Sequence, residues 1–517
     1  MASLSANHSC VGSTFSTLTL FGAQTLSVEA GIVSGYNFDV PTGWRYSQPA
    51  ANVQNETFCN VTVTYTHPGR NDSINVETWL PVHNWNGRLQ ALGGGGWVAG
   101  RFVLTYGGMA GAVHDGYATV TTDAGVGTGL TPPTWTLLSP GNLDLGAFDD
   151  FGQVSLNDAA VIAKDVIRRY YGKGPSYSYF NGCSQGGRQA GILAQQFPTA
   201  YDGIIAAAPG LYWAELLISV VWPAFYMDLT KQYPHGCELT QLTSLAVSLC
   251  DGLDGIEDGL IAEPEECRRI FSPSDYVGIK FNCSASGTIM EISSAAASVA
   301  NAMWDGPRYS NGEFLWYGFE VGSDLATIAA TTCDQNGQCI PAAREDLTFV
   351  YQNFVLKDPS ANVSKITYSQ FDSMSRLLKR LFSASMAATE PHLVDFRNSG
   401  GKMITYHGLA DQAISPAGTL HYYKEVLKLP YDTIDFYRYY RVPGLEHCWG
   451  GTGGQPEALF DQLRLWVENG TAPVASPVKI QSNSTTTDEV LCPYPKKASF
   501  QRASTDLSFT AGYWTCK

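Results

Sequence analysis

The sequence predicts an α/β fold in which a mostly parallel sheet is flanked by helices and a large lid domain is inserted into the core. From about Val61 to Pro209, short β-branched or aromatic runs alternate with helical patterns, as in βα units stacked on a parallel sheet. After Gly210 the alternation fades, and aromatic residues, cysteines and Asp-Gly turns accumulate until GGKMITYHGLAD restores it. We therefore expect a core of residues 1–209 and 398–517 and a lid of residues 210–397.

The core elements follow from local patterns. Strands are predicted where short apolar or β-branched runs stop at turn residues, and helices where apolar residues recur at helical spacing. In chain order we expect a strand at 88–92 (RLQAL), a helix at 156–170, a strand at 177–180, a helix at 187–197, and strands at 402–406 and 434–442.

Composition excludes several classes of protein. The chain has 517 residues, 44% of them hydrophobic, which is enough for a large buried core. A net charge of −15 argues against nucleic acid as a partner, because phosphate binding needs a basic surface. The most apolar window, residues 203–226, is interrupted by Pro209, Glu215 and Pro223, so we expect neither a transmembrane helix nor a membrane partner.

Cysteines and glycosylation motifs indicate a secreted protein. The 12 cysteines contain no CxxC pair, which favours a disulfide framework over zinc binding. The start, MASLSANHSC, lacks a secretory signal, so we expect a trimmed or replaced N-terminus. N-linked glycans are expected at the Asn-x-Ser/Thr motifs, which begin at Asn7, Asn55, Asn60, Asn71, Asn282, Asn362, Asn469 and Asn483.

Ser184 is the candidate nucleophile. It lies at the centre of Gly182-Cys183-Ser184-Gln185-Gly186, a GxSxG motif between a predicted strand and a predicted helix. Such a turn exposes the serine oxygen, and the small residues avoid clashes around it. The alternative is a glycine-rich loop with a solvated serine.

His447 is the candidate base. In α/β hydrolases the serine is followed along the chain by the acid and then the histidine, each on a loop after a strand. His447 follows the strand expected at 434–442 and lies near the C-terminus. The competitor, His407, sits at the end of a strand, where we expect a structural hydrogen-bonding role.

Asp411 is the candidate acid. The strand expected at 402–406 leads directly into His407-Gly408-Leu409-Ala410-Asp411, which favours Asp411 over Asp432 and Asp435. The alternative is an ordinary turn residue, since aspartate is common in turns.

One cysteine lies next to the candidate nucleophile and another next to the candidate base. Cys183 directly precedes Ser184, and Cys448 directly follows His447. A disulfide between them would hold the nucleophile and the base together, and catalytic hydrogen bonds fail when partners drift by about 1 Å.

With Cys183-Ser184, Asp411 and His447-Cys448, the sequence resembles the tannase and feruloyl esterase family, and the likeness extends from about Cys59 to Cys516. The resemblance implies a secreted α/β hydrolase with a lid over its active site. Its substrate would be a small or polysaccharide-linked ester of a hydroxycinnamic or gallic acid, cleaved through an acyl-enzyme.

The oxyanion of that reaction needs backbone N–H donors. One is expected from Gln185, the residue after the nucleophile. The other is expected from the glycine run Gly93–Gly96, with Gly95 favoured over its neighbours. A phosphate-binding loop is a poor alternative, because no Lys-Ser/Thr follows and there is no GxGxxG motif.

An acidic loop in the lid, CDGLDGIEDGL from Cys250 to Leu260, is a candidate calcium site. It is not an EF-hand, and spacing alone leaves calcium and a solvated acidic turn equally open. The resemblance implies a structural Ca²⁺ held by the side chains of Asp251, Asp254 and Asp258 and the carbonyls of Ile256 and Leu260. It also implies that a Cys250–Cys267 disulfide brackets the loop.

The other cysteine pairs are hypotheses, because connectivity cannot be deduced from sequence. They are Cys492–Cys516, Cys333–Cys339, Cys10–Cys59 and, by elimination, Cys237–Cys283. Two other functions stay open. One is an acyltransferase, peptidase or other esterase using the same triad; the other is a non-catalytic secreted binding protein, against which the complete triad argues.

Overall fold

The computed structural model describes residues 9–16, 18–129, 134–334, 338–342, 344–363, 365–482, 485–502 and 512–517. Its centre is a nine-stranded sheet with the order β1-β2-β3-β5-β4-β8-β9-β14-β15. These strands are β1 (Gln24–Val40), β2 (Ala51–Thr66), β3 (Ile74–Pro81), β4 (Arg88–Leu92), β5 (Ala118–Thr122), β8 (Tyr177–Cys183), β9 (Gly203–Ala207), β14 (Lys402–Gly408) and β15 (Tyr437–Val442). The six strands from β5 to β15 in this order run parallel, and β1 to β3 extend the sheet as an antiparallel edge. The predicted α/β fold is confirmed.

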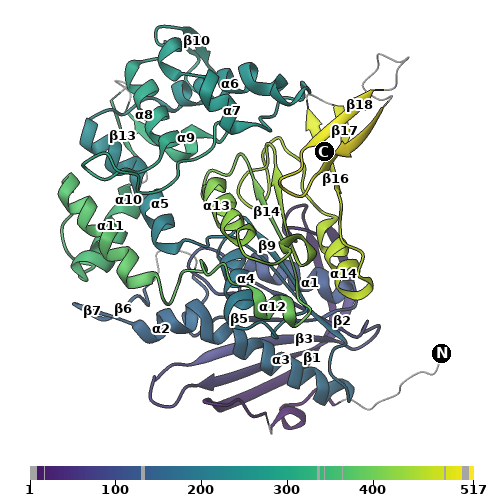
Figure 1. Ribbon diagram of the computed structural model, residues 1–517. Coiled ribbons are helices and arrows are strands. Elements are labelled where there is room, and N and C mark those ends of the chain that lie inside the picture. The colour runs from purple at the N-terminus through teal and green to yellow at the C-terminus, as the bar shows by residue number, and fades with distance from the viewer. Residues whose placement is uncertain are drawn as a thin grey trace.

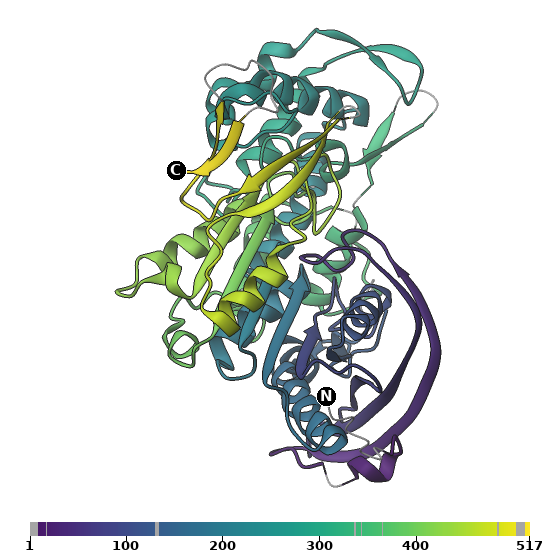
Figure 2. The same cartoon turned by 90° about the vertical axis from the view of Figure 1, so that its right-hand side faces the viewer.

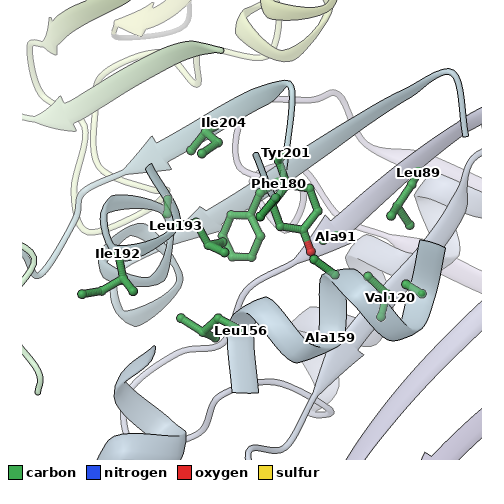
Figure 3. Close-up of a cluster of buried hydrophobic side chains, with 14 of the residues drawn as sticks. Leu89, Ala91, Val120, Leu156, Ala159, Phe180, Ile192, Leu193, Tyr201 and Ile204 are labelled. Atoms are coloured by element: carbon green, nitrogen blue, oxygen red, sulfur yellow. The ribbon is translucent and has the colours of Figure 1, made fainter. Parts of the chain in front are cut away.

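Helices cover both faces of this sheet. On one face, α3 (Ser155–Tyr171), α4 (Gln185–Gln196) and α13 (Pro416–Leu427) pack into one buried cluster with the strands, part of which Figure 3 shows. On the other face lie α1 (Val103–His114) and α14 (Leu459–Asn469). Because side chains alternate along a strand, Ile204 joins the first cluster and Ile205 the second.

The lid is mainly helical and stands over one end of the sheet in Figure 1. Its helices are α5 (Trp213–Thr230), α6 (Gly236–Cys250), α7 (Pro264–Ile270), α8 (Ser294–Asp305), α9 (Leu325–Ile328), α10 (Arg344–Val350) and α11 (Tyr368–Phe382), and its hairpins are β10 (Lys280–Cys283) with β11 (Thr288–Glu291) and β12 (Thr331–Cys333) with β13 (Cys339–Pro341). Among the described residues, no strand of the central sheet falls within 210–397. The buried cluster of the lid also takes in Phe148 and Phe151, which precede it in the chain.

Shorter elements complete the fold. Before α3 come the hairpin β6 (Leu137–Ser139) and β7 (Asn142–Leu143), then α2 (Leu145–Asp149) and a π-helix at Asp150–Val154; α12 (Val394–Asn398) returns the chain to the core. Two C-terminal hairpins lie outside the central sheet, β16 (Ser476–Ser482) with β17 (Thr485–Leu491) and β18 (Ala498–Arg502) with β19 (Gly512–Cys516). In Figure 2 these hairpins lie beside the lid, and the long β1–β2 ribbon curves around α1.

The disulfide framework is confirmed. The structure has six disulfides, which are the six predicted pairs: Cys10–Cys59, Cys183–Cys448, Cys237–Cys283, Cys250–Cys267, Cys333–Cys339 and Cys492–Cys516. Within the described part of the chain, we find no helix with the length and apolar character needed to cross a bilayer.

Candidate active site

Ser184 sits on a strained turn between β8 and α4. Its backbone has φ 63° and ψ −118°, a conformation that a non-glycine residue adopts only where the surroundings impose it. Glycine at position 182 is required, because a Cβ there would lie 2.6 Å from the carbonyl carbon of Gly186. The Ser184 N–H is anchored to the carbonyl of Ala207 in β9 at 3.1 Å. This is the geometry of a nucleophile elbow.

Asp411 and His447 form a hydrogen-bonded pair. The Nδ1 atom of His447 lies 2.8 Å from Oδ2 of Asp411, and the carboxylate is fully buried while the imidazole is 21% exposed. Burial favours the neutral carboxyl, but the charge of His447 and the hydrogen bonds of His447 and His407 outweigh it and hold the pKa of Asp411 well below its usual range. For His447, burial lowers the pKa, yet the carboxylate of Asp411 more than offsets this and leaves the pKa raised.

The Cys183–Cys448 disulfide brings this pair to the elbow. The Cα atoms of the two cysteines are 5.9 Å apart, so Ser184 and His447 are the chain neighbours of directly bonded residues. In the described structure the Ser184 hydroxyl makes no hydrogen bond; such bonds are often long in ligand-free enzymes and tighten when substrate binds. The main chain of His447 is also fixed, because its N–H donates to Oε1 of Gln412 at 3.1 Å.

The predicted oxyanion donors lie on two adjoining loops. Gln185 is the first residue of α4, where backbone N–H groups have no partner within the helix. The glycine run abuts it, since the N–H of Gly186 donates to the carbonyl of Gly94 at 3.0 Å. The N–H of Gly95 already donates to Val98 O at 3.1 Å, so Gly95 can serve an oxyanion only as a shared donor.

Two buried residues of α4 hold these loops together. Gln189 accepts a hydrogen bond from the N–H of Gly94 and donates one to Ala99 O, both at 2.9 Å. Arg188 donates from Nε to Oε1 of Gln185 at 2.8 Å. Its other nitrogens donate to the carbonyls of Phe151, Gly152 and Met386. These contacts join the elbow to the π-helix and to the end of the lid.

The comparisons with known proteins agree with this geometry. A family model described as tannase and feruloyl esterase matches residues 59–510. The chain belongs to the tannase and feruloyl esterase family. A probable feruloyl esterase from Arthroderma benhamiae is 35% identical over 459 residues, covering 86% of this chain and 84% of that protein. The tannase of Aspergillus oryzae is 26% identical over 510 residues, with 87% and 85% covered. Membership makes this chain a carboxylic ester hydrolase.

A solved structure supports the fold of this tannase and feruloyl esterase family member. The tannin acyl hydrolase from Aspergillus niger superposes with a TM-score of 0.85 at 24% identity, covering 98% of this chain and 95% of that one. The predicted α/β-hydrolase architecture is therefore confirmed over nearly the whole molecule.

The acidic loop of the lid closes on itself. A 3-10 turn, Asp251–Asp254, follows α6, and Oδ1 of Asp251 accepts the N–H groups of Asp258 and Gly259 at 2.9 and 2.8 Å. Burial, and then the carboxylate of Glu489, raise the pKa of Asp258 to about 7. Among the described residues, none of the three predicted ligand aspartates forms an ion pair. Their oxygen donors are of the kind that Ca²⁺ prefers, but the carboxylate oxygens of the three aspartates do not all lie within 4.8 Å of one another.

Sequence reasoning missed Arg188, Gln189 and Gln412. Periodicity offered a signal for the first two, because residues three and four positions after Gln185 lie on its face of the helix. For Gln412 the only signal was its place beside Asp411.

Proposed function

We propose that this protein hydrolyses esters of aromatic acids, of the hydroxycinnamoyl (feruloyl) or galloyl type, with Ser184, His447 and Asp411 as its triad. The observation that carries this is the Asp411–His447 pair, tethered to the nucleophile elbow through Cys183–Cys448. The names of the relatives point the same way, since one is a probable feruloyl esterase and another a tannase.

Aromatic side chains beside the glycine run support an aromatic acyl group. Trp97 directly follows this run and packs edge-on against Trp213 and Phe349 of the lid, with ring centroids 5.3 and 5.6 Å apart. Aromatic rings favour such edge-to-face contacts with one another. A planar aromatic acid bound near the oxyanion donors would therefore meet a surface of matching chemistry.

The reaction proceeds by acyl transfer in two steps. His447 takes the proton of the Ser184 hydroxyl as its oxygen attacks the ester carbonyl, and returns that proton to the leaving alcohol. Water, activated by the same imidazole, then hydrolyses the acyl-enzyme. Throughout, Asp411 keeps the proton of His447 on Nδ1, so that Nε2 faces the nucleophile, and the Gln185 N–H with a donor of the glycine run holds the oxyanion.

The test is hydrolysis of methyl ferulate, methyl caffeate, methyl gallate and a simple aliphatic ester. We expect the aromatic esters to be preferred and Ser184→Ala to lose at least about 10³-fold in kcat. Ser248→Ala, at an exposed serine of α6, is the matched control. Undiminished activity of Ser184→Ala would reject the nucleophile. Preferential transfer to an added alcohol would identify an acyltransferase, and binding without turnover a binding protein.

A structural Ca²⁺ in the lid belongs to the same proposal. The residues that would hold it are Asp251, Asp254 and Asp258 through their carboxylates, and Ile256 and Leu260 through their carbonyls. The ion would offset the mutual repulsion of these carboxylates and stiffen the loop that Cys250–Cys267 closes.

Secretion and N-linked glycosylation complete the proposal. Five acceptor asparagines are exposed, namely Asn55, Asn71, Asn282, Asn362 and Asn469, and Asn60 is half-buried with a hydrogen bond to Glu77. Asn7 and Asn483 lie outside the described residues. A mass shift on treatment of the secreted protein with an N-glycosidase would test for the glycans, and an unchanged mass would reject them.

A further inference from the structure

We propose that His407 is a positioning residue of the triad, which clamps the carboxylate of Asp411 and thereby sets the orientation and basicity of His447. This inference rests on the proposed triad and adds a fourth member to it. His407 lies near the end of β14, four residues before Asp411, and its side chain is fully buried.

Every polar atom of the His407 ring has a partner. Nε2 lies 3.0 Å from Oδ2 of Asp411 and 3.1 Å from the carbonyl of Ile414. Nδ1 lies 2.8 Å from Oγ1 of Thr419 in α13. The ring therefore bridges from the carboxylate to the helix that follows it, and neither nitrogen is available to a substrate.

These partners assign the proton of the ring. A carboxylate and a backbone carbonyl can only accept, so Nε2 carries the hydrogen; a threonine hydroxyl can donate, so Nδ1 can act as the acceptor. A neutral imidazole satisfies all three contacts without placing a further charge in the interior. His407 thus acts as a fixed donor to Asp411, which differs from the role of a general base.

With His407 in place, the carboxylate of Asp411 is saturated. Its Oδ2 accepts hydrogen bonds from Nε2 of His407 and Nδ1 of His447. Its Oδ1 accepts the N–H groups of Ala413 and Ile414, both at 2.8 Å. A carboxylate offers about four lone-pair directions, and all four are used. It therefore cannot rotate away from Nδ1 of His447.

Loss of His407 has two consequences. The carboxylate becomes free to turn on the side that faces His447, which misplaces the base and lowers kcat. Its negative charge is also shared with one donor fewer, so the imidazolium of His447 is stabilised more strongly and its pKa rises. The other ionisable groups nearby are Glu446, in the same loop as His447, and Asp324, at the start of α9; both stay in place in the variants below.

The test compares His407→Phe, His407→Gln and Thr419→Val in the full-length enzyme, with hydrolysis of methyl ferulate measured over pH. We expect His407→Phe to lower kcat about 10²-fold with little change in KM, and to move the acid limb of kcat/KM to higher pH. His407→Gln keeps an amide donor and should recover part of kcat. His421→Gln, at a partly exposed histidine of α13, is the control and should match the wild type.

Thr419→Val and one further variant, Asp411→Asn, make each outcome decisive. If His407→Phe does not fold, Thr419→Val decides, because it removes only the anchor of Nδ1; a severalfold loss of kcat with a shifted acid limb supports the clamp. Wild-type kcat and pH profile in a folded His407→Phe or in Thr419→Val would overturn it. Asp411→Asn distinguishes a failure of the triad from a failure of the clamp. Full activity of Asp411→Asn would reject the triad itself. Impaired activity of Asp411→Asn together with an unaffected His407→Phe would reject the clamp alone.

Discussion

The disulfide between Cys183 and Cys448 joins the two loops that carry Ser184 and His447, and both cysteines are almost completely buried. It crosses 265 residues of chain. No hydrogen bond in the described structure connects Ser184 directly to His447, so this covalent link is the shortest connection between nucleophile and base.

Removing that link should impair catalysis as well as stability. For Cys183→Ala with Cys448→Ala, we expect kcat to fall by about 10²-fold because the base drifts from the nucleophile. Stability should fall by about 2–5 kcal/mol, since the unfolded chain regains freedom. The matched control is Cys492→Ala with Cys516→Ala, a pair in the C-terminal hairpins, which should lose stability but keep kcat. Equal kcat in both double variants would contradict the bracing role.

The pH dependence of kcat/KM should report His447. Its pKa is raised above the ordinary value of 6.5, because the effect of Asp411 exceeds that of burial. A protonated imidazole cannot accept the serine proton, so activity should climb as pH rises through an apparent pKa above 6.5. In Asp411→Asn the carboxylate that raises the pKa of His447 is gone, so the acid limb of kcat/KM should move to lower pH while kcat falls about 10³–10⁴-fold. An acid limb at the same pH in both proteins would contradict this origin.

Gln189 should matter to the transition state more than to substrate binding. Gln189→Leu removes the bonds to Gly94 and Ala99 that hold the glycine run against α4, and we expect at least a tenfold loss of kcat, up to about 10². Gln189→Glu keeps an acceptor for Gly94 but loses the donor to Ala99, so its kcat should lie between those of the wild type and Gln189→Leu. Gln195→Leu is the control, because Gln195 lies on the same helix but bonds to Ala388, Tyr422 and Glu390, away from the glycine run. A change confined to KM would count against the assignment.

Local sequence patterns predict a strand correctly where its apolar residues are buried and turn residues mark its ends. The strand Arg88–Leu92 is predicted with its observed bounds, since glycines bracket an apolar run. The strand expected from Ile434 begins instead at Tyr437, because Thr433–Asp435 form a 3-10 turn. Ile434 is 45% exposed there, so its apolar character does not indicate a buried strand position.

The residues of the candidate site also fall into those that the sequence predicts and those that it does not. Ser184, Asp411 and His447 are predictable because a motif and a fixed chain order mark them, and the flanking cysteines add a second signal. The role of Gln189 in holding the glycine run against α4 is not predictable, because its partner Ala99 lies 90 residues away in the sequence. Only the packing of α4 against the loop after β4 brings that pair together, and no local pattern encodes this contact.

The acidic loop of the lid should make stability depend on calcium. We expect chelation to lower the melting temperature of the wild type, and added Ca²⁺ to restore it; at a calcium concentration 100 times Kd the stabilisation would be about 2.7 kcal/mol. Asp254→Asn and Asp258→Asn should abolish the response, because each removes a proposed ligand. Glu257→Gln is the matched control, since Glu257 is exposed in the same loop and is not a proposed ligand. Metal analysis that finds no calcium in the purified protein, together with a melting temperature that is indifferent to chelator, would reject the site.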